Sequence, residues 1–181
     1  MMGAEQDLRV DNRTHMLYFS GQAFPCDRDV EAALPWRDHA LLLSSDTDCL
    51  SLWDQDGLIR LTKVGVYPQD MAIHKDTAVV CGGADGKIHL LTLPELLPLA
   101  EYPVPGMPER ICIAAESSYI LTLLTEPEVH TALLTLDFCS GGYSKLAEYV
   151  GIPEAISSDK SGLWITLSEG TVRLSFDTLT I

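Results

Sequence analysis

The feature that most constrains the fold of this chain is a repeat of about forty residues. Three segments, GVYPQDMAI, PGMPERICI and VGIPEAISS, occupy residues 65–73, 105–113 and 150–158. In each segment a proline is followed by Gln or Glu, and an apolar residue comes two places further on. The prolines, Pro68, Pro108 and Pro153, are spaced by 40 and 45 residues. Such self-similarity indicates that one small structural unit is stacked several times.

Each repeat start is followed by a polar turn, an apolar run, a second turn and an alternating run. The alternation is clear at 87–90 and 171–174 and predicts β-strands with one more buried face. Asp85-Gly86 and Glu169-Gly170 lie where a tight hairpin is needed, and glycine there accepts a positive φ. Residues 36–52 form an earlier copy that aligns with 74–90, which places Glu31 opposite Gln69 although this copy lacks the proline.

The sequence therefore predicts an all-β protein, a β-propeller with about four blades per chain. The expected blades are 25–64, 65–104, 105–149 and 150–181. The last unit has room for only about three strands. We therefore expect an N-terminal strand at 14–20, which contains the sequence THMLYF, to complete the last blade. Four blades make either a narrow closed ring or half of a ring shared by two chains, and we favour the homodimer.

Two sets of motifs resemble known propeller families. CGGADGKIHLLTL at 81–93 and CLSLWDQDG at 49–57 resemble the closing strands of WD-repeat blades, and the GxxPxxI starts are similar to YVTN-type and lactonase-like propellers. The Gly-His pair of WD repeats is absent, and the Tyr-Val-Thr-Asn position holds Ala-Val-Val-Cys at 78–81. The resemblance covers 25–181 and implies the fold. The lactonase-like part of it implies a metal or acid–base cluster in the central channel.

Composition and charge exclude several classes of function. The 181 residues carry a formal net charge of -14 with 12 Lys and Arg and no basic run, so we expect no nucleic-acid binding. No stretch approaches the ~18 apolar residues of a membrane span, and the first residues lack the apolar core of a secretory signal, so we expect a cytoplasmic protein without a membrane contact. Five cysteines without a CxxC pair are expected to be small buried hydrophobic residues rather than zinc ligands.

The candidate site is the position directly after the repeated proline. Glu31, Gln69, Glu109 and Glu154 are equivalent in the repeat, and the innermost strand of a propeller blade borders the channel. Carboxylates converging there would suit calcium, the one metal we consider; otherwise no cofactor is expected. The alternative is that each residue only solvates a loop. Arg110, together with His74, is a second candidate, as a contact for an anion or substrate near the same channel.

Catalytic signatures are missing from the sequence. It contains no GxSxG elbow and no P-loop, and the five histidines fall in different phases of the repeat. We therefore predict a non-catalytic interaction module that presents its propeller faces to a protein partner or a small ligand. The alternative is a lactonase-like or other hydrolase with a divalent cation in the channel. Convergence of the repeat carboxylates within reach of one metal ion would distinguish the two.

Overall fold

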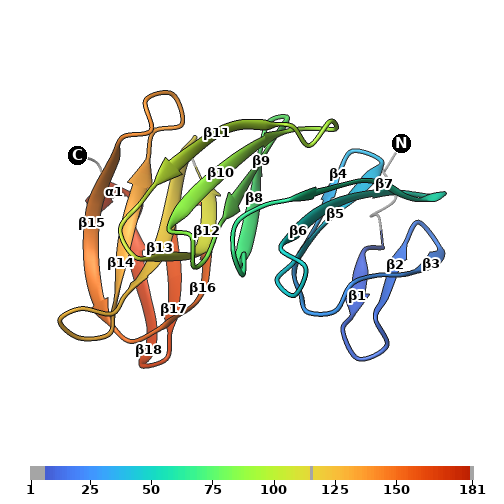
Figure 1. Ribbon diagram of the computed structural model, residues 1–181. Helices are drawn as coiled ribbons and strands as arrows, with labels where there is room; N and C mark the ends of the chain where they lie inside the picture. Colours follow the sequence, from blue (N-terminus) through green and yellow to red (C-terminus); the bar gives the residue numbers. More distant parts are fainter. Residues whose placement is uncertain (1–6, 115, 180–181) are drawn as a thin grey trace.

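The computed structural model describes residues 7–114 and 116–179 as five antiparallel sheets followed by one short helix (Figure 1). The first sheet contains β1 (Arg9–Asp11), β2 (Met16–Phe19) and β3 (Gln22–Pro25); the second contains β4 (Val30–Trp36), β5 (His39–Ser44), β6 (Cys49–Asp54) and β7 (Gly57–Lys63). The third contains β8 (Asp70–His74), β9 (Thr77–Cys81), β10 (Lys87–Thr92) and β11 (Pro98–Pro103); the fourth contains β12 (Met107–Ala114), β13 (Ser117–Leu124), β14 (His130–Leu136) and β15 (Tyr143–Val150). The fifth contains β16 (Pro153–Ser158), β17 (Gly162–Leu167) and β18 (Gly170–Ser175), and α1 is Phe176–Leu179.

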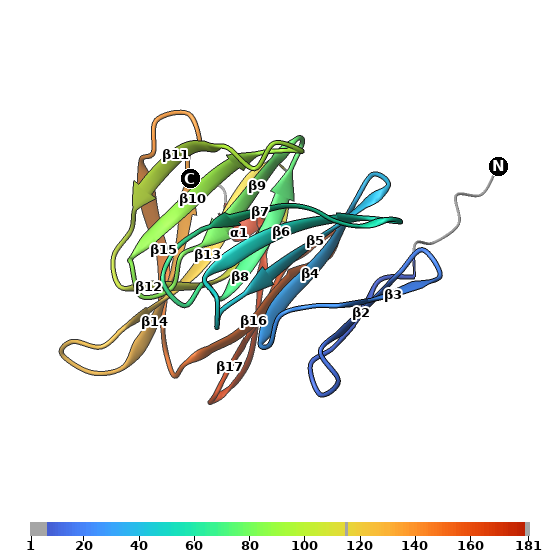
Figure 2. The ribbon, with the colours of Figure 1, turned by 45° about the vertical axis from the view of Figure 1, so that its right-hand side comes forward.

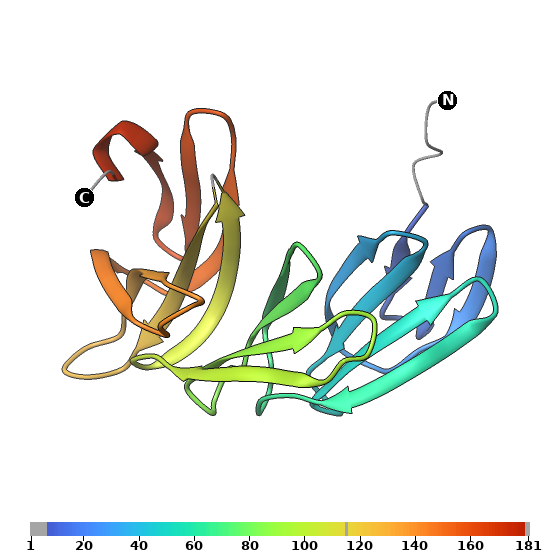
Figure 3. The same cartoon turned by 90° about the horizontal axis from the view of Figure 1, so that it is seen from above.

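The sheets follow one another in an arc that does not close (Figure 3). The first sheet, in blue, and the fifth, in red, lie at its two ends, and the second sheet lies between the first and the third (Figure 2). Strands β4, β8, β12 and β16 are the first of their sheets, and each packs against the next in that series, so they line the inner side of the arc. The predicted all-β propeller architecture is confirmed. No helix in the described part of the chain is long and apolar enough to cross a membrane.

The sheets are held together by four apolar clusters, each lying between two adjacent sheets. The alternating strands send side chains to both faces, so every inner sheet contributes to two clusters. In β13, for example, Ile120 belongs to the cluster shared with the third sheet, and Leu121 to the cluster shared with the fifth. Both side chains are fully buried. Because no sheet has a core of its own, each is stabilised by its neighbours.

The N-terminal strand does not complete the last blade, contrary to the sequence-based prediction. Its β2 segment pairs with β1 and β3 and forms the first sheet, next to the second sheet. Leu17 and Phe19 are fully buried there, in a cluster with Trp53 and other side chains of the second sheet. The turn between β2 and β3 consists of Ser20 and Gly21, both with positive φ, which is the geometry of a two-residue hairpin. Local pairing through short turns costs little loop-closure entropy, and it buries the apolar face of β2.

The tryptophans and the cysteines differ in their burial. Trp36 and Trp53 are buried, but Trp164 is 41% exposed on the outer face of the fifth sheet. Among the cysteines, Cys49 and Cys81 are buried as expected and Cys139 is exposed. The predicted burial is therefore wrong for Cys139, which lies in the turn between β14 and β15, and Trp164 is exposed because no further sheet of the described residues covers that face.

Truncating a side chain between two sheets should destabilise the protein far more than truncating one on an outer strand. We expect Leu121→Ala to lower the free energy of unfolding by about 2–5 kcal/mol, because it leaves a cavity between the fourth and fifth sheets. Leu58→Ala, at a side chain 51% exposed on β7, should change it by less than about 0.5 kcal/mol. Urea unfolding followed by circular dichroism measures both, and equal losses would contradict this core assignment.

Candidate functional site

The repeat position predicted from the sequence is a β-bulge on the innermost strand. The pairing register shifts at Glu31 in β4, at Glu109 in β12 and at Glu154 in β16. In the third sheet the N–H of Gln69 bonds to the Cys81 carbonyl while Asp70 is paired with the same residue. The four aligned residues thus occupy one structural place, including Glu31, whose repeat lacks the proline. Because successive innermost strands pack side by side, these bulges lie at one end of the inner side of the arc, which we call the bulge end.

The residue after the bulge links one innermost strand to the next. In β8 it is Asp70, whose Oδ2 accepts a hydrogen bond from the Ile111 N–H of β12 at 3.0 Å. In β12 the same place holds Arg110, whose Nε donates to the Glu154 carbonyl of β16 at 2.6 Å and whose Nη1 donates to the Glu109 carbonyl. Sequence reasoning did not single out Asp70. The repeat alignment was the signal that could have found it, because it places Asp70 opposite Arg110.

Two carboxyl groups at the bulge end are disfavoured in their charged form. Burial raises the pKa of Asp70, and the hydrogen bonds from backbone N–H groups and the nearby Arg110 charge only partly offset it. Burial also raises the pKa of Glu109; Arg110 opposes that rise and the carboxylate of Glu31 adds to it. Desolvation of a carboxylate costs free energy that a cation placed beside it would recover. The bulge end is therefore electrostatically suited to a cationic group.

The other predicted site residues have different surroundings. The Glu31 carboxylate accepts a hydrogen bond from Ser45 Oγ at 2.6 Å, and Gln69 Nε2 donates to the Tyr67 carbonyl in its own loop. Glu154 is exposed. His74 lies at the end of β8 away from its bulge, with its ring 5.6 Å from that of Phe138. Arg110 directly follows the bulge of β12, so the two residues named together lie at different heights of the innermost strands, and their role as contacts for an anion or substrate stays a prediction.

The carboxylates share a position without forming a metal-ligand set. Within residues 7–114 and 116–179, no three His, Cys, Asp or Glu side chains gather closely enough to hold a metal ion. The histidines do not converge either: His89 contacts Asp85 at 2.6 Å, whereas His130 lies in another sheet beside Glu148. The bulge end therefore presents several carboxylates and the guanidinium of Arg110, and the backbone bulges position these groups.

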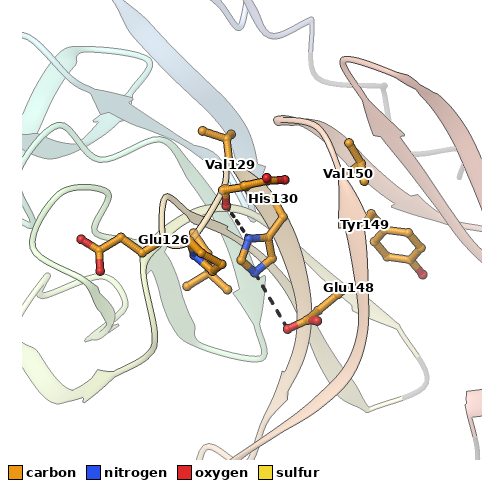
Figure 4. Close-up of a pocket in the computed structure, with 9 residues that line it drawn as sticks. Glu126, Val129, His130, Glu148, Tyr149 and Val150 are labelled. Atoms are coloured by element: carbon orange, nitrogen blue, oxygen red, sulfur yellow. Dashed lines mark hydrogen bonds and ion pairs between the residues drawn. The ribbon is translucent and has the colours of Figure 1, made fainter.

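Sequence reasoning missed a cavity of about 640 Å³ beside the loop between β13 and β14 (Figure 4). Its walls combine the carboxylates of Glu126, Glu128 and Glu148 with exposed apolar side chains, Val129 and Val150. His130 donates from Nδ1 to the Glu128 carbonyl at 2.7 Å, and its Nε2 lies 3.9 Å from Glu148 Oε1. The loop follows the end of β13, where β12 begins, so the cavity lies at the same end of the fourth sheet as the bulge of β12, but on the side of the outer strands β14 and β15. The run TEPEVH at 125–130 carried the signal, since its acidic residues flank a proline.

Comparison with known proteins identifies the fold and no family. No family model matches the chain, and no curated protein is similar to it in sequence. Among solved structures it is similar to streptogramin B lyase (TM-score 0.75, 15% identity), to the dihydro-heme d1 dehydrogenase NirN (0.74, 14%) and to the WD40 propeller domain of Doa1 (0.71, 14%). Of this chain 94%, 94% and 87% are covered in these matches. The chain spans 65%, 41% and 55% of the three, less than two thirds of each. All three are β-propellers, and identities this low show the fold alone.

Removing the charge of Glu109 should make folding less sensitive to pH. The folded-state pKa of this carboxyl is raised above its ordinary value of 4.5, so the folded protein holds the proton more tightly than the unfolded chain. The protonated form of Glu109 therefore contributes to the free energy of unfolding. This contribution has its full size when the pH is below the ordinary pKa, and it is lost as the pH rises through the folded-state pKa. Glu109→Gln has no such loss, so its free energy of unfolding should rise relative to the wild type between about pH 4 and about pH 7.

Urea unfolding of both proteins at the two pH values measures this difference. Glu95→Gln is the matched control, because Glu95 is exposed in the turn between β10 and β11 at the opposite end of its sheet. A constant difference between Glu109→Gln and the wild type across the range would contradict the proposed burial of this carboxyl.

Proposed function

We propose that this protein is a non-catalytic interaction module and that its bulge end binds a cationic segment of a protein partner. The observation that carries the proposal is the placement of Glu31, Glu109 and Glu154 at equivalent bulges of three of the four innermost strands, with the Gln69 bulge of β8 between the first two. Arg110 is held by backbone carbonyls, and no ion pair joins it to a carboxylate in the described part of the chain. The acidic groups there therefore keep their capacity to attract an incoming cation.

The cavity beside the β13–β14 loop supports a protein partner over a small ion. Its three carboxylates surround Val129 and Val150, which are 50% and 76% exposed. A lysine or arginine side chain combines an apolar stem with a charged head and fits such a mixed surface. A peptide could place one basic residue in the cavity and others at the bulges, which belong to the same end of the sheets.

Several contacts favour binding over catalysis. A nucleophile needs a base within hydrogen-bond reach and access to substrate. Ser45 donates its one hydroxyl proton to Glu31 at 2.6 Å, but it is only 8% exposed, and its Oγ also lies 3.3 Å from the Asp29 carbonyl. This arrangement suits a structural role for the hydroxyl. The hydrolase with a divalent cation remains the alternative, and the test below separates it from the binding function.

Titration calorimetry of the full chain with hexa-arginine tests the proposal, with hexa-glutamate as the ligand control. Binding of hexa-arginine should weaken as salt rises from about 0.05 M to about 0.5 M, because the contacts are charged. Glu31→Gln combined with Glu109→Gln should weaken it by about tenfold. Glu95→Gln combined with Glu116→Gln removes two carboxylates from the opposite end and should leave the affinity within about twofold.

Equal losses in the two double variants would contradict a site at the bulge end. Calcium supplies the other decisive result. A rise in melting temperature at millimolar calcium that Glu109→Gln with Glu154→Gln abolishes would favour the divalent-cation alternative, because a ligand that binds only the folded state stabilises it.

A further inference from the structure

The fifth sheet is one strand shorter than the three complete sheets, and the missing strand is the outermost one. β16 carries the bulge of an innermost strand, and β17 and β18 follow it in the order of the second and third strands. In the complete sheets the third strand is covered by a fourth, as β14 is by β15. No strand in the described residues pairs with the outer edge of β18.

β18 is poorly buried, both as an edge strand and as part of a sheet whose outer face no further sheet of the described residues covers. The third strands of the complete sheets, β6, β10 and β14, each have at least four buried residues in succession. No residue of β18 is buried: Thr171 and Arg173 are exposed, and Val172 and Leu174 are only partly buried. An edge of this kind presents backbone N–H and C=O groups that an added strand can satisfy.

The first sheet cannot provide the missing strand while it keeps its own structure. β2, the segment expected to close the last blade, is the central strand of that sheet and is hydrogen-bonded on both sides. Its Leu17 and Phe19 are fully buried against the second sheet. The two three-stranded sheets lie at opposite ends of the arc (Figure 3). The first sheet is therefore not the occupant of the β18 edge.

The side chains of β18 define what that occupant needs. Val172 and Leu174 pack against the cluster between the fourth and fifth sheets, so an apolar side chain added beside them would extend this cluster. Arg173 points to the opposite face, with its guanidinium 5.2 Å from the ring centre of Trp164 and a 2.5 Å hydrogen bond to Ser161 Oγ. Within the described residues Arg173 has no ion pair with a carboxylate. Cross-strand pairing of opposite charges stabilises a sheet, so a carboxylate is the complementary neighbour.

We propose that β18 accepts an extended segment of another protein, which adds as the fourth strand of the fifth sheet. The segment alternates apolar residues, which lie beside Val172 and Leu174, with an acidic residue beside Arg173. A second copy of β18 fits poorly in either near register. Antiparallel pairing over the full strand places Arg173 opposite Val172, so a charged side chain shares a face with an apolar one, and a shift by one residue places Arg173 opposite Arg173, where like charges are destabilising. Main-chain hydrogen bonds would supply the affinity, and the alternating side chains the specificity.

The probe is an eight-residue capped peptide that alternates valine and glutamate, compared with one that alternates valine and lysine. Calorimetry measures affinity, and hydrogen exchange of the 170–175 amides locates the contact. The full chain should bind the glutamate peptide at least about tenfold more tightly than the lysine peptide, and exchange at 170–175 should slow. Arg173→Glu should invert this preference, a gain of binding that a merely unfolded variant could not produce.

The matched control is Arg60→Glu, at an exposed arginine on β7, the outer edge strand of the second sheet. It should retain the preference for the glutamate peptide. Loss of that preference in Arg60→Glu but not in Arg173→Glu would overturn the proposal by assigning the peptide to β7. A glutamate peptide with proline at its centre should not slow exchange at 170–175, and slowing by that peptide would also overturn strand addition. So would a dimer, detected by light scattering, in which the 170–175 amides are protected without peptide.

Discussion

The burial of apolar side chains between successive sheets is the interaction on which this structure depends. A single sheet has no interior, so its apolar side chains can be buried only where one of its two faces packs against another sheet. The buried leucines and isoleucines of one strand alternate between the cluster before it and the cluster after it, as Ile120 and Leu121 do. The stability of each sheet therefore depends on the sheets beside it, and the two end sheets have half of this support.

The ends of the arc have outer faces on which an aromatic ring is covered by an arginine. At the first sheet the guanidinium of Arg9 lies 4.2 Å from the ring centre of Tyr18, and at the fifth Arg173 covers Trp164. A cation over an aromatic face is favourable, and it gives an apolar surface a polar exterior. Terminal units of stacked-repeat proteins need such an exterior for solubility. The same stack places Arg173 beside the open edge of β18, so one residue serves both the outer face and the proposed strand acceptor.

The stacking of the sheets also creates the candidate binding end. The innermost strands must lie side by side for the clusters to form, and this brings their bulges into one region. Asp70 and Glu109 lie there with raised pKa values because burial disfavours their charge. Groups that cost stability at neutral pH are common at binding sites, where the ligand offsets the cost.

The repeat carried most of what the sequence could predict. The prolines marked three innermost strands, and the alignment placed Glu31 opposite Gln69 in the one copy without a proline, a position that the structure shows to be a bulge. The first sheet was not predictable, since β1 has only three residues and β3 reads QAFP, without alternation. Its existence rests on Leu17 and Phe19 finding the open face of the second sheet, a contact that no local pattern encodes. The acidic cavity was missed because Glu148 joins Glu126 and Glu128 only through the pairing of β14 with β15.

The central claim is that the N-terminal strand packs on the second sheet and leaves the arc open. Spin labels on cysteines introduced at Thr14 and Thr171, with Cys26, Cys112 and Cys139 replaced by serine because they are not buried, test it directly. Strands that pair lie about 5 Å apart, so closure by the N-terminal strand would bring the labels close enough to broaden the continuous-wave spectrum. The open arc predicts that the doubly labelled protein gives the sum of the two singly labelled spectra. Dipolar broadening in the double variant would contradict the account.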